Sequence, residues 1–310
     1  MDHIVEIEGL NKHYETGFWR KKQVRGLEDL SLNVAPGQIF GFLGGNGAGK
    51  TTTIKILMRL LYPSSGTARI LGMDISDVSM HSQIGYCPEN PYFYDYLTAN
   101  ELMDYFGRLF GLDSAKRRAK TDELLTAVGL AEKDRTKQLR KFSKGMLQRV
   151  GLAQSLINDP QIVFMDEPMS GLDPVGRREI RELISGLREK GTTVFMSTHI
   201  LSDVEALCSE VAILRNGRLS ASGKLADLLV SDAASRSFEI IASGIAAESF
   251  DISQIAGASV HTKPNGTGIE VLDEAQIGSV IDMVRRSGGS LISVNPVKQS
   301  LEELFVERSG

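Results

Sequence analysis

The sequence lacks the charge pattern of a nucleic-acid-binding protein and the cysteines of a disulfide-rich one. Its 310 residues carry 35 basic and 39 acidic side chains, a formal net charge of −4, so no basic excess is present to neutralise a phosphate backbone. Cys87 and Cys208 are its two cysteines, and their separation fits no metal-ligand spacing. We therefore expect no nucleic-acid partner, and two buried or idle thiols in a reducing compartment.

Long apolar runs are also missing. No stretch approaches the ~20 apolar residues that a membrane-spanning helix needs. The first six residues include acidic side chains and lack the apolar centre of a secretory signal. We expect a soluble, cytosolic protein, for which any role at a membrane would come through a partner.

Strand and helix patterns alternate over the first 230 residues, which predicts an α/β fold with a largely parallel, helix-covered sheet. Continuous apolar runs predict buried strands at 38–43, 162–165 and 192–197. Alternating residues predict short strands at 5–8 and 30–34. Helical spacing predicts helices at 50–61, 101–110, 115–128 and 175–190.

The pattern changes near residue 230. Ser231–Ser235 has the composition of a linker, and the tail after it is predicted to run strand, short helix, strand, strand, helix, strand, helix. Its predicted strands and helices lie at 238–242, near 260, 269–272, 275–286, 291–294 and 301–307. We expect a first domain at 1–230, helix-rich at roughly 91–160, and a small α+β accessory domain at 236–310.

A glycine-rich segment lies between a predicted strand and a predicted helix. Residues 44–51 match the pattern G-x-x-x-x-G-K-[ST], in which glycines let backbone N–H groups surround a phosphate and the helix dipole faces it. Lys50 would bridge the β- and γ-phosphates, and the Thr51 hydroxyl would ligate Mg²⁺. A flexible glycine turn is the alternative. The residues predicted to hold ATP here are Gly44, Gly45, Asn46, Gly47, Ala48, Gly49, Lys50, Thr51 and Thr52.

Two carboxylates end the predicted strand at 162–165. Side chains alternate along a strand, so Asp166 and Glu167 should face different surroundings. Asp166 is placed to hold Mg²⁺ through water, and Glu167 to polarise the attacking water as a general base. The alternative is a strand with a solvated acidic end, which the nearby phosphate loop disfavours.

Three further segments resemble motifs of the ATP-binding-cassette (ABC) ATPases over roughly residues 1–230. Phe142–Met146 precedes a helix and is similar to the signature motif, Ser170–Asp173 looks like the D-loop, and Ser197–His199 is similar to the switch-histidine loop. The resemblance implies a P-loop cassette with an antiparallel β subdomain and a helical subdomain. It also implies ATP and Mg²⁺ as ligands.

The resemblance further implies a head-to-tail dimer that encloses two ATP molecules. Ser143, Lys144, Gly145 and Met146 would cap the γ-phosphate held by Lys50 of the other copy. Asp173 would couple the two sites, and His199 would join Glu167 and Lys50 as catalytic residues. Tyr14 matches the aromatic that stacks on adenine, with a core tyrosine as the alternative.

The sequence departs from the family pattern at three places. Gly45 stands where proline is usual, which should loosen the loop. Lys144 and Met146 replace Gly and Gln in the signature motif, where we expect capping to survive. Glu89 takes the glutamine position of the Q-loop, and because a carboxylate cannot donate a hydrogen bond, its role as a Mg²⁺ ligand stays open.

Three segments are candidates for contact with a partner, and two of them have a second interpretation. The aromatic run Pro91–Tyr96 suits either a groove for a helix of a membrane subunit or local core packing. Arg20–Lys22, beside Trp19, suits a solvated hairpin tip or contact with lipid headgroups. Gln299–Phe305 looks like the end of cassettes from the type-2 exporter branch, which are encoded separately from their membrane subunits.

We expect the ATPase subunit of an ABC exporter that dimerises with a second copy or a paralogous cassette. It would lie on the inner face of the cell membrane, held by integral membrane permease subunits. The alternatives are a soluble ABC ATPase with a non-transport partner, and a non-hydrolysing ATP-gated module. Intact Lys50, Asp166, Glu167 and His199 argue against the last.

Overall fold

The computed structural model describes residues 2–16, 22–228, 237–247, 250, 252 and 255–296. The chain forms two compact units, Met1–Leu225 and Ala226–Gly310. Several sequence predictions lie outside the described residues, namely the linker at 231–235, the terminal helix at 301–307, the segment 299–305 and the basic residues 20–21. Within the described residues, no helix combines the length and apolar character required to cross a bilayer.

The first unit is built on a six-stranded sheet in the order β10-β9-β3-β8-β7-β6. Its strands are β3 (Ile39–Leu43), β6 (Ile84–Cys87), β7 (Ile162–Asp166), β8 (Thr193–Thr198), β9 (Glu210–Arg215) and β10 (Arg218–Lys224). The pairs from β6 to β9 are parallel, and β10 runs antiparallel to β9. Every residue of β3, β7 and β8 is buried, as predicted from their apolar runs.

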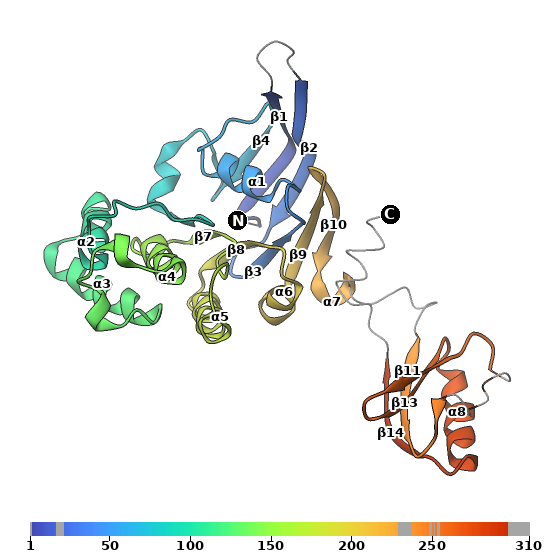
Figure 1. Ribbon diagram of the computed structural model, residues 1–310. Helices are drawn as coiled ribbons and strands as arrows, with labels where there is room; N and C mark the ends of the chain where they lie inside the picture. The colour runs from blue at the N-terminus through green and yellow to red at the C-terminus, as the bar shows by residue number, and fades with distance from the viewer. Residues whose placement is uncertain are drawn as a thin grey trace. The chain divides into compact units, whose positions relative to one another are not determined.

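Helices cover both faces of this sheet (Figure 1). On one face lie α1 (Lys50–Leu57) and an antiparallel sheet, order β2-β1-β4-β5, formed by β1 (Val5–Thr16), β2 (Lys22–Val34), β4 (Ser65–Ile70) and β5 (Met73–Asp74). On the other lie α5 (Pro174–Glu189) and α6 (Leu201–Leu207). In the core, the Phe195 ring lies 5.2–5.5 Å from the ring centres of Phe40, Phe42 and Phe164. This confirms the predicted α/β fold.

Helices α2 (Ala99–Leu109), α3 (Ser114–Ala127) and α4 (Lys144–Ser155) gather beside the β6 end of the sheet (Figure 1). Short 3₁₀ turns lie at Val78–Ser82, Glu132–Asp134 and Leu139–Lys141. Side-chain caps fix where the helices begin: Thr98 and Glu101 form a reciprocal capping box on α2, and Asp113 caps α3. These caps satisfy backbone N–H groups in the first turn of each helix.

Three predicted lengths are wrong. The strand predicted at 30–34 begins at Lys22 as part of β2. The helix predicted at 50–61 ends at Leu57, because Arg59 takes the left-handed conformation with φ +56°. The strand predicted at 5–8 continues to Thr16 as β1, with register shifts after Ile7 that break the alternation on which the prediction rested.

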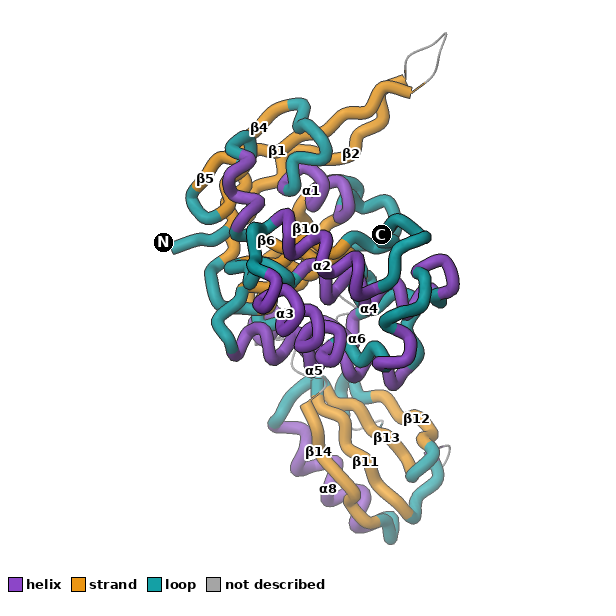
Figure 2. Tube along the Cα trace, turned by 90° about the vertical axis from the view of Figure 1, so that its left-hand side faces the viewer, coloured by secondary structure: helices purple, strands orange, loops and turns teal. Residues whose placement is uncertain are grey.

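The second unit holds a four-stranded antiparallel sheet in the order β12-β13-β11-β14 (Figure 2). Its elements are β11 (Phe238–Ser243), β12 (Ser259–Lys263), β13 (Gly266–Val271), α8 (Ala275–Arg286) and β14 (Ser290–Pro296), with α7 (Leu225–Leu228) at the boundary between the units. This strand order is that of a split βαβ fold. Helix α8 covers one face, and Val280 and Val284 pack there with Ile240 and Ile269.

Candidate nucleotide-binding site

The glycine-rich loop joins the end of β3 to the start of α1. Gly47 and Gly49 have φ of +79° and +110°, a conformation that side chains with a Cβ rarely adopt. A Cβ on Gly44 would lie 2.8 Å from both the Ala48 Cβ and the Leu214 carbonyl oxygen. The loop can therefore close this tightly only with glycine, and it forms a cradle against the first turn of α1.

The Lys50 side chain lies inside this loop. Its residue is 6% exposed, and its ammonium donates to the Gly44 carbonyl oxygen at 2.7 Å. The same ammonium is 3.3 Å from Oε1 of Glu167, which is also buried. A buried cation beside a single carboxylate is well suited to receive a second anion.

Glu167 connects Lys50 to His199. The His199 Nδ1 atom lies 2.9 Å from both carboxylate oxygens of Glu167. Glu167 has φ +50°, so the chain leaves the strand geometry directly after Asp166. Asp166 and Glu167 therefore face different partners, as predicted. They do so because Glu167 adopts the left-handed conformation and turns the chain out of the strand.

Ser197 ties the two carboxylates to β8. Its hydroxyl donates to Oδ1 of Asp166 at 2.5 Å and accepts from the Glu167 backbone N–H at 3.2 Å. Ser197 was singled out in the sequence only as part of the histidine loop. Its function in orienting Asp166 becomes visible only when β7 and β8 are paired.

These side chains line a pocket of about 360 Å³. The predicted residues that line it are Tyr14, Gly45, Asn46, Gly47, Ala48, Gly49, Lys50, Thr51, Thr52, Glu89, Glu167 and His199. Four further residues line it, namely Val24, Arg25, Gly26 and Ser170, and the first three were not predicted from the sequence. Val24, Arg25 and Gly26 lie on β2, and no motif marks them. Ser170 was named only as the first residue of the D-loop segment.

Tyr14 lies across one wall of this pocket. Its hydroxyl is 3.1 Å from the Thr52 hydroxyl, and the Lys12 ammonium lies 5.4 Å from its ring centre. A Cβ on Gly26 would be 2.5 Å from the Tyr14 ring, so the glycine makes room for the aromatic. Tyr14 is half-buried rather than a core tyrosine.

Of the signature and D-loop residues, only Ser170 lines this pocket. Ser143 caps α4 by accepting from the Met146 backbone N–H, and Asp173 caps α5 by accepting from the Gly176 N–H. The two caps are near each other, because a Cβ on Gly145 would lie 3.4 Å from the Gly171 carbonyl oxygen. The structure thus groups Ser143, Lys144, Gly145 and Asp173 on a second surface, apart from Lys50.

Burial raises the pKa values of three side chains of the cassette, Tyr86, Cys87 and Cys208. Burial, with the Asp166 carboxylate as a second cause, raises the pKa of Tyr86 and of the Cys87 thiol far above their usual ranges. Burial also raises the pKa of Cys208 to about 12. Both cysteines are free and buried, as predicted, and both are protonated at neutral pH.

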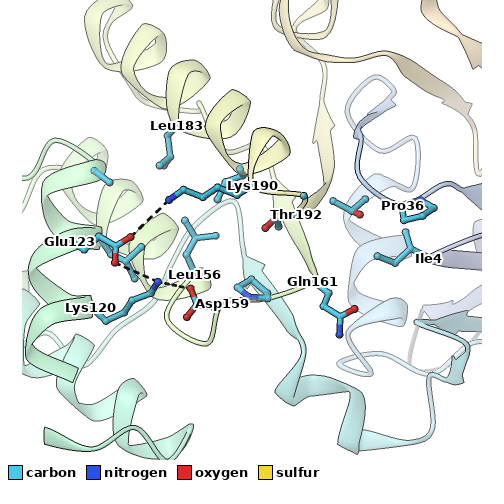
Figure 3. Close-up of a pocket in the computed structure, with 16 residues that line it drawn as sticks. Ile4, Pro36, Lys120, Glu123, Leu156, Asp159, Gln161, Leu183, Lys190 and Thr192 are labelled. Carbon is cyan, nitrogen blue, oxygen red and sulfur yellow. Dashed lines mark hydrogen bonds and ion pairs between the residues drawn. The ribbon is translucent and has the colours of Figure 1, made fainter. Parts of the chain in front are cut away.

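A separate pocket of about 430 Å³ lies among α3, α5 and the segments that precede β7 and β8 (Figure 3). Its wall includes Gln161 and Thr192, at the amino ends of those strands. Ion pairs from Lys120 to Asp159 and from Lys190 to Glu123 cross it. The glycine loop and Glu167 follow the carboxyl ends of their strands, so this pocket is distinct from the candidate site.

Comparisons with known proteins agree with this geometry. A sequence profile described as ABC transporter matches residues 27–170. An ABC transporter ATP-binding protein of Synechocystis is 43% identical over 98% of this chain and 84% of the relative. The bacitracin transport ATP-binding protein BcrA of Enterococcus faecalis is 32% identical over 100% of this chain and 97% of its own length.

Solved structures give the same result. A dimeric ATP-binding cassette in a post-hydrolysis state, bound to ADP and phosphate, superposes with a TM-score of 0.67 at 25% identity over 71% of this chain and 98% of that one. A glycine cradle with a buried lysine, a carboxylate held by a histidine, and relatives named as ABC transporter ATP-binding proteins all agree. The chain belongs to the ATP-binding subunits of ABC transporters, and it is an ATPase.

Proposed function

We propose that the pocket around Lys50 binds ATP together with Mg²⁺ and hydrolyses it to drive export. The single observation that carries this proposal is the buried contact of Lys50 with Glu167, itself held by His199, at the mouth of the glycine loop. The glycine loop is so tight that a side chain at Gly44 would clash, which leaves its backbone groups to surround a phosphate. The Lys50 ammonium is held by a loop carbonyl oxygen, which a phosphate can replace.

The residues present also fit Mg²⁺. Among the described residues, no three His, Cys, Asp or Glu side chains meet as a metal cage. Mg²⁺ bound with a nucleotide needs only one or two protein oxygens beside the phosphates, and Thr51 and Asp166 would provide them. Glu89, in the pocket wall, would reach it through water. When bound, Mg²⁺ would neutralise phosphate charge and orient the terminal phosphate.

Glu167 is the proposed general base. Its carboxylate would accept a proton from the attacking water, and the His199 imidazole at 2.9 Å would hold that carboxylate in place. Tyr14, half-buried on the pocket wall, would turn from Thr52 to stack on the base. Ser143 and its neighbours would cap the nucleotide of the second copy, since they lie apart from this chain's own pocket.

A binding titration tests the site. Lys50→Ala should weaken binding of a fluorescent ATP analogue about 10- to 100-fold, because hydrogen bonds to charged groups contribute about 1.5–3 kcal/mol. Lys55→Ala is the matched control, because Lys55 is an exposed lysine of the same helix. Glu167→Gln with Mg-ATP should abolish turnover and double the mass on a sizing column. Equal affinity for Lys50→Ala and the unaltered chain would overturn the proposal.

We further propose that the permease docks on an apolar groove of about 400 Å³, which would place the subunit at the cytoplasmic face of the membrane. Leu60, Pro91, Tyr92, Phe93, Phe106 and Phe110 are among the residues that line it. Local core packing is wrong for Tyr92, Tyr94 and Tyr96, which are 97%, 56% and 60% exposed. Such a patch marks a docking surface.

Export is supported by the relatives' names, which refer to bacitracin transport and daunorubicin resistance. The docking surface is tested by co-purification with the permease from detergent-solubilised membranes. Tyr92→Asp should remove the permease from the purified complex. Tyr105→Asp, an exposed aromatic outside the groove, should retain it. Retention by both variants would contradict docking at this groove.

A further inference from the structure

Two departures from the family pattern have opposite charges. Glu89 puts a carboxylate where glutamine is usual, and it lines the nucleotide pocket with Glu167. The pocket's other cation, Arg25, is already paired with Glu28 at 3.1 Å. Near the phosphate cradle, the carboxylates of Glu89, Glu167 and Asp166 therefore outnumber the ammonium group of Lys50. A nucleotide adds further negative charge, and like charges at close range repel.

Lys144 puts a cation where glycine is usual. It is exposed, and among the described residues its ammonium makes no ion pair. It is the first residue of α4, directly after the capping Ser143, and the first turn of that helix holds no acidic residue. A cation at this end opposes the helix dipole, so the position is unfavourable until an anion approaches.

The Lys144 side chain has a defined place on the surface. A Cβ on Gly171 would lie 3.0 Å from the Lys144 Cδ and 3.3 Å from its Cγ and Cε, so the lysine stem lies along the D-loop backbone. Gly171 has φ +75° and no side chain to displace the stem. The stem is thereby supported while the charged end stays in solvent.

We propose that Lys144 of one subunit neutralises the partner's Glu89 around the γ-phosphate when the two cassettes close. This inference rests on the proposed head-to-tail dimer, in which the signature surface of one copy faces the Lys50 pocket of the other. The extra carboxylate repels nucleotide in the open subunit, and the extra ammonium compensates for it only in the closed dimer. The pair makes ATP retention depend on closure, and Lys144 acts as a positioning residue.

A double-mutant cycle tests this coupling through dimer formation rather than turnover. All variants carry Glu167→Gln, and the dimer dissociation constant with Mg-ATP is measured by analytical ultracentrifugation. Lys144→Gln should weaken the dimer about tenfold when Glu89 is present and less than about threefold with Glu89→Gln, because the charge that it opposes is gone. Lys144→Arg should restore the dimer, and added salt should shrink the difference.

A second variant separates this effect from net charge. Lys141→Gln removes an equal charge from an exposed lysine three residues earlier, outside the signature motif, and should leave the dissociation constant within about twofold. If Glu167→Gln alone stays monomeric with Mg-ATP, the proposed function fails. If it dimerises, an equal Lys144→Gln penalty in both Glu89 backgrounds, or an equal penalty for Lys141→Gln, overturns the coupling alone.

Discussion

The two sheets of this protein place their polar groups differently. In the cassette, β3, β7 and β8 are buried along their whole length, and the reactive side chains follow the strand ends. In the accessory unit, α8 covers one face of the sheet, and ionisable groups lie along the strands. There Glu239 on β11 pairs with His261 at 3.0 Å and Lys263 at 2.5 Å, both on β12.

The comparison shows how burial directs chemistry. A sheet covered on both faces has no room for charged groups along its strands, so Lys50, Glu167 and His199 collect where the strands stop. A sheet with a polar face carries charges anywhere along it, and there they satisfy one another. Each unit contains a His–Glu pair, His199 with Glu167 after the strand ends and His261 with Glu239 on the strands, which makes a matched test.

The largest expected difference is catalytic. His199→Ala should lower the phosphate-release rate by about 10²-fold or more, because it removes the imidazole that holds the general base. His261→Ala removes the equivalent pair from the accessory sheet and should change the rate less than about twofold. An equal loss for both variants would break the contrast between the two sheets.

The next difference is in core packing. Phe195→Ala should lower the free energy of unfolding by about 3–5 kcal/mol, because its ring contacts three other phenylalanines at the centre of the cassette. Ile269→Val in the accessory core should cost about 0.5–1.5 kcal/mol. Hydrogen exchange measured at increasing urea concentration assigns each loss of unfolding free energy to one unit. A loss spread over both units would show that they unfold together.

A smaller effect concerns the loop at the end of β3. Gly45→Pro should raise the free energy of unfolding by about 0.4–1 kcal/mol with catalysis kept, because proline restricts the unfolded chain. The position suits it: a Cβ there meets nothing within 4 Å, and Gly45 is not among the residues with positive φ. An unchanged or lower melting temperature would count against this.

The smallest effect is a pH dependence of the accessory unit. The hydrogen bond from Lys263, with a smaller one from His261, lowers the pKa of Glu239 below its ordinary 4.5. A carboxyl with a lowered folded pKa adds stability that is full above 4.5 and is lost as the pH falls through the folded value. Lys263→Met should lower stability at pH 7 by less than about 1 kcal/mol and flatten the loss that occurs below pH 4.5, measured by thermal unfolding.

Much of the candidate site could be predicted because its motifs are contiguous. The glycine loop that ends at Lys50 follows one predicted strand, and Asp166 and Glu167 follow another, so parallel strands bring both groups to one edge of the sheet. The end of α1 could not be predicted, because the helical spacing of apolar residues continues to Leu61. Nothing in the sequence marks the left-handed conformation of Arg59, which ends the helix earlier. Val24, Arg25 and Gly26 were missed because they enter the pocket from a strand of the other sheet.

Residue order alone specified the phosphate loop, the carboxylates and the alternation of strands and helices, because those depend on local spacing and on burial of apolar runs. Pairing of β7 with β8 is what brings the Ser197 hydroxyl to Asp166 and the His199 imidazole to Glu167, some thirty positions away in the chain. The folded contact between α4 and the D-loop likewise lays the Lys144 stem on Gly171. Such contacts depend on long-range packing, and no local spacing encodes them.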